Sequence, residues 1–333
     1  MKANILHGIK EPIRYEEVEM PIGKTGEILI RLHASALNRR DYWIQQGQYA
    51  GLKFPIILGS DGAGEIVSAS QNDAFKNIEK EVILNPGMNW GEKESAQSFA
   101  TFKILGLPDN GTFAEYASVP AEYVYPKPKH LTYTQAAALP LAGVTAYRAL
   151  FSRVGLQAGE KVLITGIGGG VALFALQFAV AAGAEVWVTS GSEEKIAKAK
   201  TMGAKGGISY HEPKWAKTLV AESGNFDVIL DSAGGDGFPF LLDLAAYGGR
   251  IATYGGTRGA IPLLSPQKIF WKQLSVFGTT MGSQKDFSAM LNFVNKHAIV
   301  PFVDTIFPLS EANAAIQSME NSKQFGKIVL NHE

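Results

Sequence analysis

The chain has 333 residues, with 31 lysines and arginines, 31 aspartates and glutamates, and 46% hydrophobic residues. A formal net charge of zero gives no electrostatic footprint for nucleic acid or an anionic membrane, and no apolar run reaches the roughly 18 residues of a membrane span. Because it contains no cysteine, the chain cannot form disulfides, thiolate nucleophiles or cysteine-ligated metal sites. We therefore expect a cytoplasmic globular protein of about two domains, without nucleic-acid or membrane partners.

Short strand-like runs and turns fill the first 124 residues. The runs lie at residues 28–34, 59–67, 81–84 and 111–119, and the second of them begins with a glycine-rich turn. The polar, glycine-containing stretch 85–109 is predicted to leave the sheet. This mixture predicts an antiparallel, β-rich domain.

The pattern changes near residue 125, after which helices and strands alternate. A helical segment over residues 134–151, interrupted near Pro140, comes first. Strands are then predicted at 162–165, 185–190, 207–210, 226–231, 249–254 and 274–278, with helices at 171–182, 193–202, 213–222 and 238–246. This alternation predicts an α/β fold with a doubly wound parallel sheet. Beyond residue 282, helices are predicted at 285–296 and 311–321 and strands at 302–307 and 327–330, and these strands can join the sheet of the first domain.

A glycine-rich turn links the first of these strands to its helix, within residues 161–183. Its members are Gly166, Gly168, Gly169 and Gly170, followed by Val171. Backbone N–H groups at such a turn, together with the helix dipole, form an anion site that a pyrophosphate can approach closely. Glycines also form ordinary tight turns, so the motif alone is a weak signal.

The end of the next strand bears on the choice of cofactor. A site for NAD places an acidic residue about 20 residues after the glycine turn, but this chain has Ser190 and Ser192 there, with Lys195 shortly after. Two hydroxyls and a cation suit a 2′-phosphate, which a carboxylate would repel. The pattern therefore favours NADPH, although the serines could simply cap the helix that begins at Glu193.

Motifs along the whole chain carry a family resemblance. They are ALNRRDYWIQQGQY, PIILGSDGAGEIV, NPGMNWG, GTFAEYASVP, AAALPLAGVTAYRAL, TGIGGGVALFALQFA, VILDSAGG, GGRIATYGG and FGKIVL. Together they resemble the medium-chain dehydrogenase/reductase superfamily, and within it the zinc-free quinone oxidoreductase (zeta-crystallin-like) branch. The resemblance implies a GroES-like catalytic domain over residues 1–124 and 283–333. It also implies a Rossmann domain over residues 125–282, with the cofactor in the cleft between the domains.

The chain departs from the zinc-dependent members of that superfamily at their metal ligands. Those members carry a cysteine where Asn38 stands, histidine and glutamate where Ser60 and Asp61 stand, and a further ligand near Leu141. The stretch 85–109 matches a lobe that holds a structural zinc on four cysteines in relatives. The resemblance therefore implies that both zinc sites are absent, and the six histidines show no ligand spacing.

Without a Lewis acid, hydrogen-bond donors must polarise the substrate carbonyl, or the acceptor must spread its own charge. Quinones and α,β-unsaturated carbonyls do the latter. The resemblance implies that Asn38, Asp41 and Tyr49 line the substrate pocket, with Asn38 orienting the carbonyl and Tyr49 donating a proton or hydrogen bond. Water is an alternative proton source, and Asp41 could merely cap a helix that starts at Tyr42.

Further cofactor contacts follow from the same resemblance, at residues spread over the second domain. They are Thr145 near the nicotinamide amide, Tyr210 at the adenine or 2′-phosphate, and Ser232, Tyr254, Gly255, Phe277 and Gly278 at the carboxyl ends of strands. For the glycines, turn geometry is an alternative explanation.

We thus expect an NADPH-dependent oxidoreductase that transfers hydride to a small electrophile, a quinone or an enone. A 2-enoyl-thioester or ketone reductase is the alternative within enzymes, and an NADPH-binding structural or regulatory protein is the alternative of another class. Relatives pair their Rossmann domains edge to edge, so a homodimer through the strand at 274–278 is a further expectation.

Overall fold

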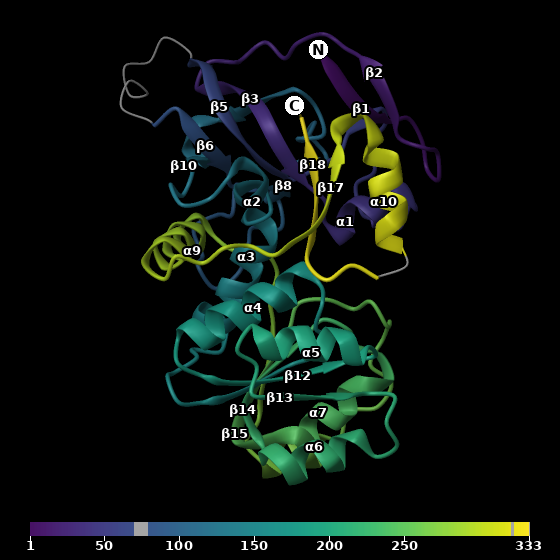
Figure 1. Cartoon of the computed structure of the whole chain (residues 1–333), viewed down its shortest axis with the longest axis vertical. Helices are drawn as coiled ribbons and strands as arrows, with labels where there is room; N and C mark the ends of the chain where they lie inside the picture. The colour runs from purple at the N-terminus through teal and green to yellow at the C-terminus, as the bar shows by residue number, and fades with distance from the viewer. Residues whose placement is uncertain (70–78, 321–322, 333) are drawn as a thin grey trace. The chain divides into compact units, whose positions relative to one another are not determined.

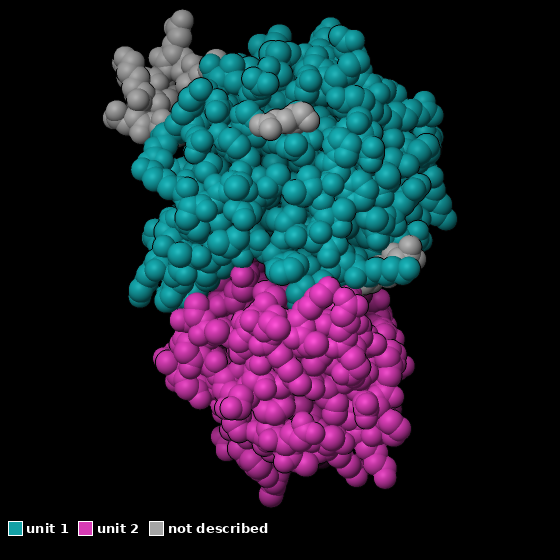
Figure 2. Space-filling model, viewed as in Figure 1, with its two compact units in different colours: residues 1–142, 282–333 teal, residues 143–281 magenta. Residues whose placement is uncertain are grey.

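The computed structural model describes residues 1–69, 79–320 and 323–332. The chain divides into two compact units, unit 1 from residues 1–142 and 282–333 and unit 2 from residues 143–281 (Figure 2). The sequence pattern placed the first change at residue 125. The later boundary arises because α2 (Tyr133–Ala137) contacts β3 (Glu27–Ala36) and β5 (Asp61–Ala69) of unit 1.

The main sheet of unit 1 has the strand order β10-β6-β5-β3-β18-β17, and β9 also pairs with β3. The other strands of this sheet are β6 (Glu81–Leu84), β9 (Tyr116–Pro120), β10 (Val124–Pro126), β17 (Val303–Pro308) and β18 (Lys327–Asn331). Alternate residues of β3 are buried, as expected for a strand with one face on the core. A smaller sheet orders β2 (Arg14–Glu17), β1 (Lys2–Leu6) and β4 (Ile56–Ile57).

The strands from beyond residue 282 join the main sheet, as predicted. β18 pairs antiparallel with β3 around Ser35 and Leu330, and parallel with β17 (Figure 1). The helices of this region are α9 (Gln284–Lys296) and α10 (Ala312–Glu320), and α10 contacts α1 (Arg39–Gln45). The strand β18 therefore lies inside the sheet, beside the strand that leads into α1.

Unit 2 is built on a six-stranded sheet, all parallel, with the order β13-β12-β11-β14-β15-β16. Its strands are β11 (Lys161–Ile164), β12 (Glu185–Ser190), β13 (Gly206–Ser209), β14 (Phe226–Asp231), β15 (Ala245–Thr253) and β16 (Ser275–Gly278). The helices are α3 (Pro140–Tyr147, which spans the unit boundary), α4 (Gly170–Ala181), α5 (Glu193–Thr201), α6 (Trp215–Ser223), α7 (Phe238–Leu244) and α8 (Pro266–Trp271). Helices α4 and α5 cover one face of the sheet and α6 and α7 the other (Figure 1). This confirms the predicted α/β fold.

Two stretches differ from the sequence-based expectation. Residues 111–113 are not strand, because their N–H groups bond to the carbonyls of the turn at residues 57–59. The helical segment ends in a π-helix (Arg148–Arg153). The stretch 85–109 leaves the main sheet, as predicted, and contains the short pair β7 (Gly87–Met88) and β8 (Lys103–Ile104).

No helix among residues 1–69, 79–320 and 323–332 has the length and apolar character needed to cross a membrane.

Candidate functional site

Unit 1 contains a cluster of buried polar side chains, which we call the buried cluster: Asn38, Arg40, Asp41, Ser60, Asp61 and Lys327. Asn38 is the N-cap of α1, Asp61 begins β5, and Lys327 begins β18. These segments meet because β3 leads into α1 and lies between β5 and β18 in the sheet. Asp41, Ser60 and Asp61 are fully buried and Lys327 is 4% exposed.

The centre of the buried cluster is a triangle of Lys327, Asn38 and Asp61. The Lys327 ammonium Nζ donates to Asn38 Oδ1 at 2.6 Å and to Asp61 Oδ2 at 3.0 Å. Asn38 Nδ2 donates to the same Asp61 Oδ2 at 2.9 Å, and Asp61 Oδ1 accepts from the backbone N–H of Leu141 at 2.8 Å. Burial of an ion pair is tolerated only when the remaining polar atoms are satisfied in this way.

Asp41 lies at the third position of α1, which starts at Arg39 and not at Tyr42. Its Oδ2 accepts from the backbone N–H of Asn38 at 2.7 Å, and its Oδ1 accepts from that of Gly59 at 3.4 Å. Burial raises the pKa of Asp41 to about 6, against the opposing effect of the nearby Arg40 guanidinium. The capping alternative for Asp41 therefore describes its contacts well, although the residue caps an earlier start of the helix.

Arg40 connects the cluster to Tyr49. Its Nη1 donates to Ser60 Oγ at 2.7 Å and to the carbonyl of Leu105 at 2.8 Å. The guanidinium carbon lies 5.2 Å from the centre of the Tyr49 ring. Tyr49 is half-buried and joins the site through this cation–π contact.

The turn between β11 and α4 in unit 2 has the form of an anion cradle. Gly166 and Gly168 have positive φ values of 65° and 127°, which favour glycine. A Cβ on Gly169, the N-cap of α4, would meet nothing within 4 Å, whereas one on Gly168 would meet Lys195 at 2.8 Å. The turn thus leaves open space above the N-terminus of a twelve-residue helix.

A second group of side chains, which we call the cationic cluster, lies around the carboxyl end of β12: Lys195, Tyr210, His211 and Arg258. The Tyr210 hydroxyl and His211 Nε2 would both lie within 3 Å of a Cβ on Gly191. The Arg258 guanidinium carbon lies 5.7 Å from the Tyr210 ring centre.

The two serines at the end of β12 act on the backbone of this turn. Ser192 Oγ accepts from the N–H of Lys195 at 3.4 Å, so the capping alternative for Ser192 is confirmed. Ser190 Oγ accepts from the N–H of Ser192 at 3.2 Å.

The remaining predicted cofactor residues are not all brought together. Ser232 lies beside the glycine turn, because its Oγ is 3.5 Å from the position that a Cβ on Gly166 would take. The carbonyl oxygen of Ser232 is 2.7 Å from the position that a Cβ on Gly255 would take. Tyr254 follows β15, and burial raises the pKa of its hydroxyl. Gly170 and Val171 form the first turn of α4, and Thr145 is buried on α3. Phe277 and Gly278 lie on the edge strand β16, which β14 and β15 separate from β11.

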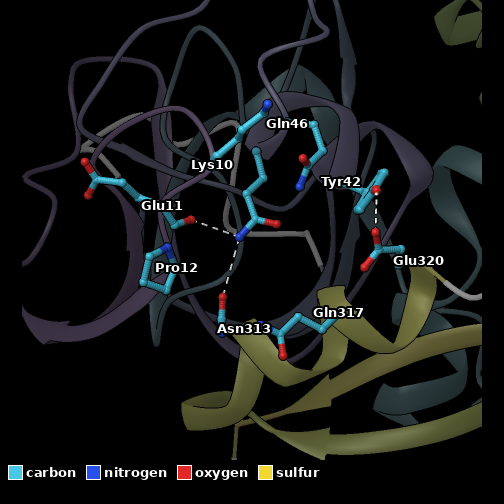
Figure 3. Close-up of a pocket in the computed structure, with 9 residues that line it drawn as sticks. Lys10, Glu11, Pro12, Tyr42, Gln46, Asn313, Gln317 and Glu320 are labelled. Atoms are coloured by element: carbon cyan, nitrogen blue, oxygen red, sulfur yellow. Dashed lines mark hydrogen bonds between the residues drawn. The ribbon is translucent and has the colours of Figure 1, made fainter.

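A polar pocket of about 240 Å³ lies apart from these residues (Figure 3). It is lined by Lys10, Glu11, Pro12, Tyr42, Gln45, Gln46, Asn313, Gln317 and Glu320. Gln45 Nε2 bonds to the carbonyl of Glu11 at 3.0 Å, and the Tyr42 hydroxyl bonds to Glu320 Oε1 at 3.2 Å (Figure 3). The pocket therefore includes none of the predicted site residues.

Sequence reasoning did not place Lys327 beside Asn38 and Asp61, and it did not include His211 or Arg258 among the site residues. Lys327 stands in the run FGKIVL, where a lysine heads an otherwise apolar strand. A charged residue on a strand predicted to be buried is the signal that could have found it. Arg258 lies in a glycine-rich loop without periodicity, so only the fold brings it to Tyr210.

Two family models match the chain: the alcohol dehydrogenase GroES-like domain over residues 24–129, and the zinc-binding dehydrogenase model over residues 170–296. The zinc-type alcohol dehydrogenase-like protein YogA of Leptosphaeria maculans is 35% identical, covering 96% of this chain and 94% of its own. Mouse quinone oxidoreductase is 29% identical over 94% of this chain and 92% of its own. The crystal structure of an NAD-dependent alcohol dehydrogenase superposes with a TM-score of 0.93 at 32% identity, covering all of both chains.

The zinc that these names imply does not fit the residues of the buried cluster. Asn38, Ser60 and Leu141 offer an amide, a hydroxyl and an alkyl group, and the carboxylate of Asp61 is already paired with the Lys327 ammonium at 3.0 Å. Within the described ranges, no three histidine, aspartate or glutamate side chains are grouped so as to hold a metal ion. Zinc prefers histidine nitrogen, thiolate or free carboxylate ligands.

A pyridine nucleotide does fit the residues of unit 2. The open glycine turn at the start of α4 suits a pyrophosphate. The parallel sheet ends its strands on the same edge, where Ser232 lies beside Gly166. On the combined evidence of fold, family models and a relative at 35% identity, the chain belongs to the medium-chain dehydrogenase/reductase superfamily of NAD(P)-dependent oxidoreductases.

Proposed function

We propose that the protein is an NADPH-dependent reductase that transfers hydride to a quinone or an α,β-unsaturated carbonyl without zinc. The observation that carries this proposal is the donor set of the buried cluster, in which an ammonium neutralises Asp61 beside an amide. Such a set can donate hydrogen bonds to an oxygen but lacks the ligands of a Lewis acid. Quinones and α,β-unsaturated carbonyls delocalise the negative charge themselves, so hydrogen-bond donors are sufficient to stabilise it. Mouse quinone oxidoreductase, at 29% identity, is a relative with such a substrate in its name.

The choice of NADPH rests on the cationic cluster. Lys195, His211 and Arg258 present cationic or protonatable groups near the carboxyl end of β12, whose last residue is Ser190. Glu194, on the first turn of α5, pairs with Lys198 at 2.7 Å. We propose that Ser190, Lys195, Tyr210 and Arg258 hold a 2′-phosphate, while the glycine turn holds the pyrophosphate.

When bound, the nicotinamide supplies the hydride. Asn38 Nδ2 donates a hydrogen bond to the substrate oxygen, which gains negative charge as the hydride is added. Tyr49 or water supplies the proton, and Asp41 keeps the first turn of α1 in place. Arg40 holds the Tyr49 ring through its cation–π contact.

A second candidate activity is the interconversion of ketones and alcohols. The crystal structure with a TM-score of 0.93 is named an NAD-dependent alcohol dehydrogenase. A 2-enoyl thioester remains a third acceptor, since its carbonyl also conjugates with the double bond. A protein that binds NADPH for a structural or regulatory role is the alternative of another class.

The test is a screen of NADPH and NADH oxidation with quinones, enones, enoyl thioesters and ketones, with metal analysis of the same sample. We expect turnover of quinones or enones with NADPH and substoichiometric zinc. Tight NADPH binding without oxidation by any acceptor would contradict the enzyme proposal. Stoichiometric zinc, or turnover of ketones alone with NADH, would favour the alcohol dehydrogenase candidate.

We also propose a homodimer through β16, the edge strand of the unit 2 sheet. Large apolar side chains on β16 itself, on the neighbouring β15, on α8 and in the loop before α8 are exposed: Val276, Tyr247, Phe270, Trp271 and Leu263. An exposed strand edge with apolar neighbours is a site for pairing. Light scattering after gel filtration should give twice the mass of one chain, and Val276→Lys should reduce it to a single chain. A monomeric wild-type protein would contradict this proposal.

A further inference from the structure

Lys327 is a buried lysine whose ammonium has two defined partners. It is 4% exposed and donates to Asn38 Oδ1 at 2.6 Å and to Asp61 Oδ2 at 3.0 Å. A lysine at such a position is rare in protein interiors unless it is paired. The pairing with Asp61 explains why the charge is tolerated, but it does not by itself explain the shorter bond to Asn38.

The two charges together determine the orientation of the Asn38 amide. An ammonium can only donate hydrogen bonds and an ionised carboxylate can only accept them. The amide oxygen must therefore face Lys327 and the amide nitrogen must face Asp61. The opposite orientation would place the NH₂ group against the ammonium and the oxygen against the carboxylate, so both contacts would be repulsive. An amide whose orientation is normally ambiguous is thus fixed by its neighbours.

This orientation limits what Asn38 can offer a substrate. The amide nitrogen carries two protons, and one of them is donated to Asp61 at 2.9 Å. No other acceptor within the described part of the chain takes the second proton. The oxygen is already engaged by Lys327. The second proton of Nδ2 is therefore the hydrogen bond that Asn38 can donate to a ligand oxygen.

We infer that Lys327 is a positioning residue that, through Asn38, fixes a hydrogen-bond donor for the carbonyl oxygen of the substrate. This inference rests on the proposed reductase function. A fixed donor aimed where negative charge develops is more effective than one that must reorient during the reaction. Because Asp61 balances its charge, the ammonium acts through the amide and not as a free cation.

A simpler role for Lys327 would be to neutralise Asp61 and so permit folding. The double variant Lys327→Met/Asp61→Asn separates the two roles, because it removes both charges and leaves side chains of similar size. The amide that replaces the Asp61 carboxylate can donate or accept, so the orientation of Asn38 is no longer fixed. If neutralisation were the whole role, this variant would retain wild-type kinetics.

The experiment measures kcat, KM and NADPH affinity with the acceptor found by the screen. We expect Lys327→Met and the double variant to lose about tenfold or more in kcat/KM, the scale of a weakened oxyanion donor. NADPH affinity should stay within about twofold, since the glycine turn and the cationic cluster are untouched. Lys327→Arg, which can still only donate, should recover part of the loss.

Two further comparisons test whether the loss in the Lys327 variants acts through the Asn38 amide. In an Asn38→Ala background, Lys327→Met should cause no further loss in kcat, because the amide through which it acts is gone. Lys127→Met is the matched control, since Lys127 is also buried and bonds to the carbonyl of Leu131 at 2.6 Å and to Glu81 at 3.2 Å. We expect this control to lower stability without changing kcat/KM.

Recovery of wild-type kcat/KM in the double variant would overturn the inference and leave Lys327 as a neutralising residue. If wild-type protein reduces no acceptor, the proposed function fails, and the inference is then tested on the amide itself. Neutron diffraction of deuterium-exchanged wild-type crystals should place deuterons on the Asn38 atom that faces Asp61 and none on the atom that faces Lys327. The opposite placement would overturn the inference independently of activity.

Discussion

The buried cluster of unit 1 and the cationic cluster of unit 2 differ in how their charged groups are exposed to solvent and paired. In the first, Lys327 and Asp61 are almost completely removed from solvent and are paired at 3.0 Å. In the second, His211 and Arg258 are exposed and Tyr210 is 36% exposed. Buried charges require their partners within the fold, whereas exposed cations are stabilised by water until an anion arrives. The difference teaches that unit 1 holds its charges in fixed pairs, whereas unit 2 leaves His211 and Arg258 open to solvent, where we propose that the nucleotide binds.

The largest expected effect comes from breaking the ion pair on the buried side. Asp61→Ala should lower the free energy of unfolding by about 3–5 kcal/mol, because it leaves the Lys327 ammonium buried and unpaired. Urea denaturation of wild type and variant measures this. The double variant Lys327→Met/Asp61→Ala should be less destabilised than Asp61→Ala alone, and a larger loss in the double variant would contradict the comparison.

Substitutions in the exposed cationic cluster should change the affinity for the nucleotide and hardly change the free energy of unfolding. Arg258→Ala should weaken NADPH binding by about 1.5–3 kcal/mol, the value of a hydrogen bond to a charged group, and leave NADH binding nearly unchanged. Ser190→Asp should shift preference from NADPH toward NADH by placing a carboxylate near the 2′-phosphate. Calorimetric titration with both nucleotides measures the ratio of affinities. An unchanged ratio in both variants would mean that the cationic cluster does not meet the 2′-phosphate.

Counted per pH unit, the smallest effect is a pH dependence of stability that comes from the buried cluster. Because burial raises the pKa of Asp41 from 3.8 to about 6, the folded protein binds a proton there that the unfolded chain has lost between these values. Stability contributed by Asp41 should therefore fall as pH rises from about 4 to about 6, by up to about 1.4 kcal/mol per pH unit. The free energies of unfolding of wild type and Asp41→Asn, plotted against pH over this range, should therefore have different slopes.

Asp286→Asn is the control for the loss of the helix cap. Asp286 occupies the same third position of α9, where its Oδ2 accepts from the N–H of Ser283 at 2.9 Å. Its substitution measures what a lost capping carboxylate costs. If the free energies of unfolding of wild type and Asp41→Asn change in parallel between pH 4 and 6, Asp41 is not the group responsible for the pH dependence.

The sequence predicted the alternating part of the fold well, because helix and strand periods are local signals. Strand β12, for example, was expected and found at residues 185–190. The strand expected at 111–119 was shortened to Tyr116–Pro120, since distant carbonyls at residues 57–59 take its first N–H groups. Such competition for backbone partners leaves no local pattern.

The residues of the candidate site also divide into those that a local motif indicates and those that only the fold brings together. Asn38 and Asp41 could be proposed from one motif, because four consecutive positions place them on one helix turn. Lys327 lies 266 positions beyond Asp61, and only the insertion of β18 beside β3 brings the two together. Tyr210 follows β13 and Arg258 follows β15, and three strands separate β13 from β15, so only the path of the loop after β15 brings the two residues together. Contacts between segments this distant depend on topology and cannot be derived from periodicity.

The insertion of β18 also has a consequence for biosynthesis. Unit 2 is one continuous stretch, whereas unit 1 needs residues from both sides of it. While the ribosome is still translating unit 2, residues 1–142 hold an aspartate without its lysine and leave Ala34–Ala36 of β3 without their β18 ladder. Unit 2 can thus complete its fold first, and the nascent N-terminal segment must wait as an open sheet edge that is vulnerable to aggregation.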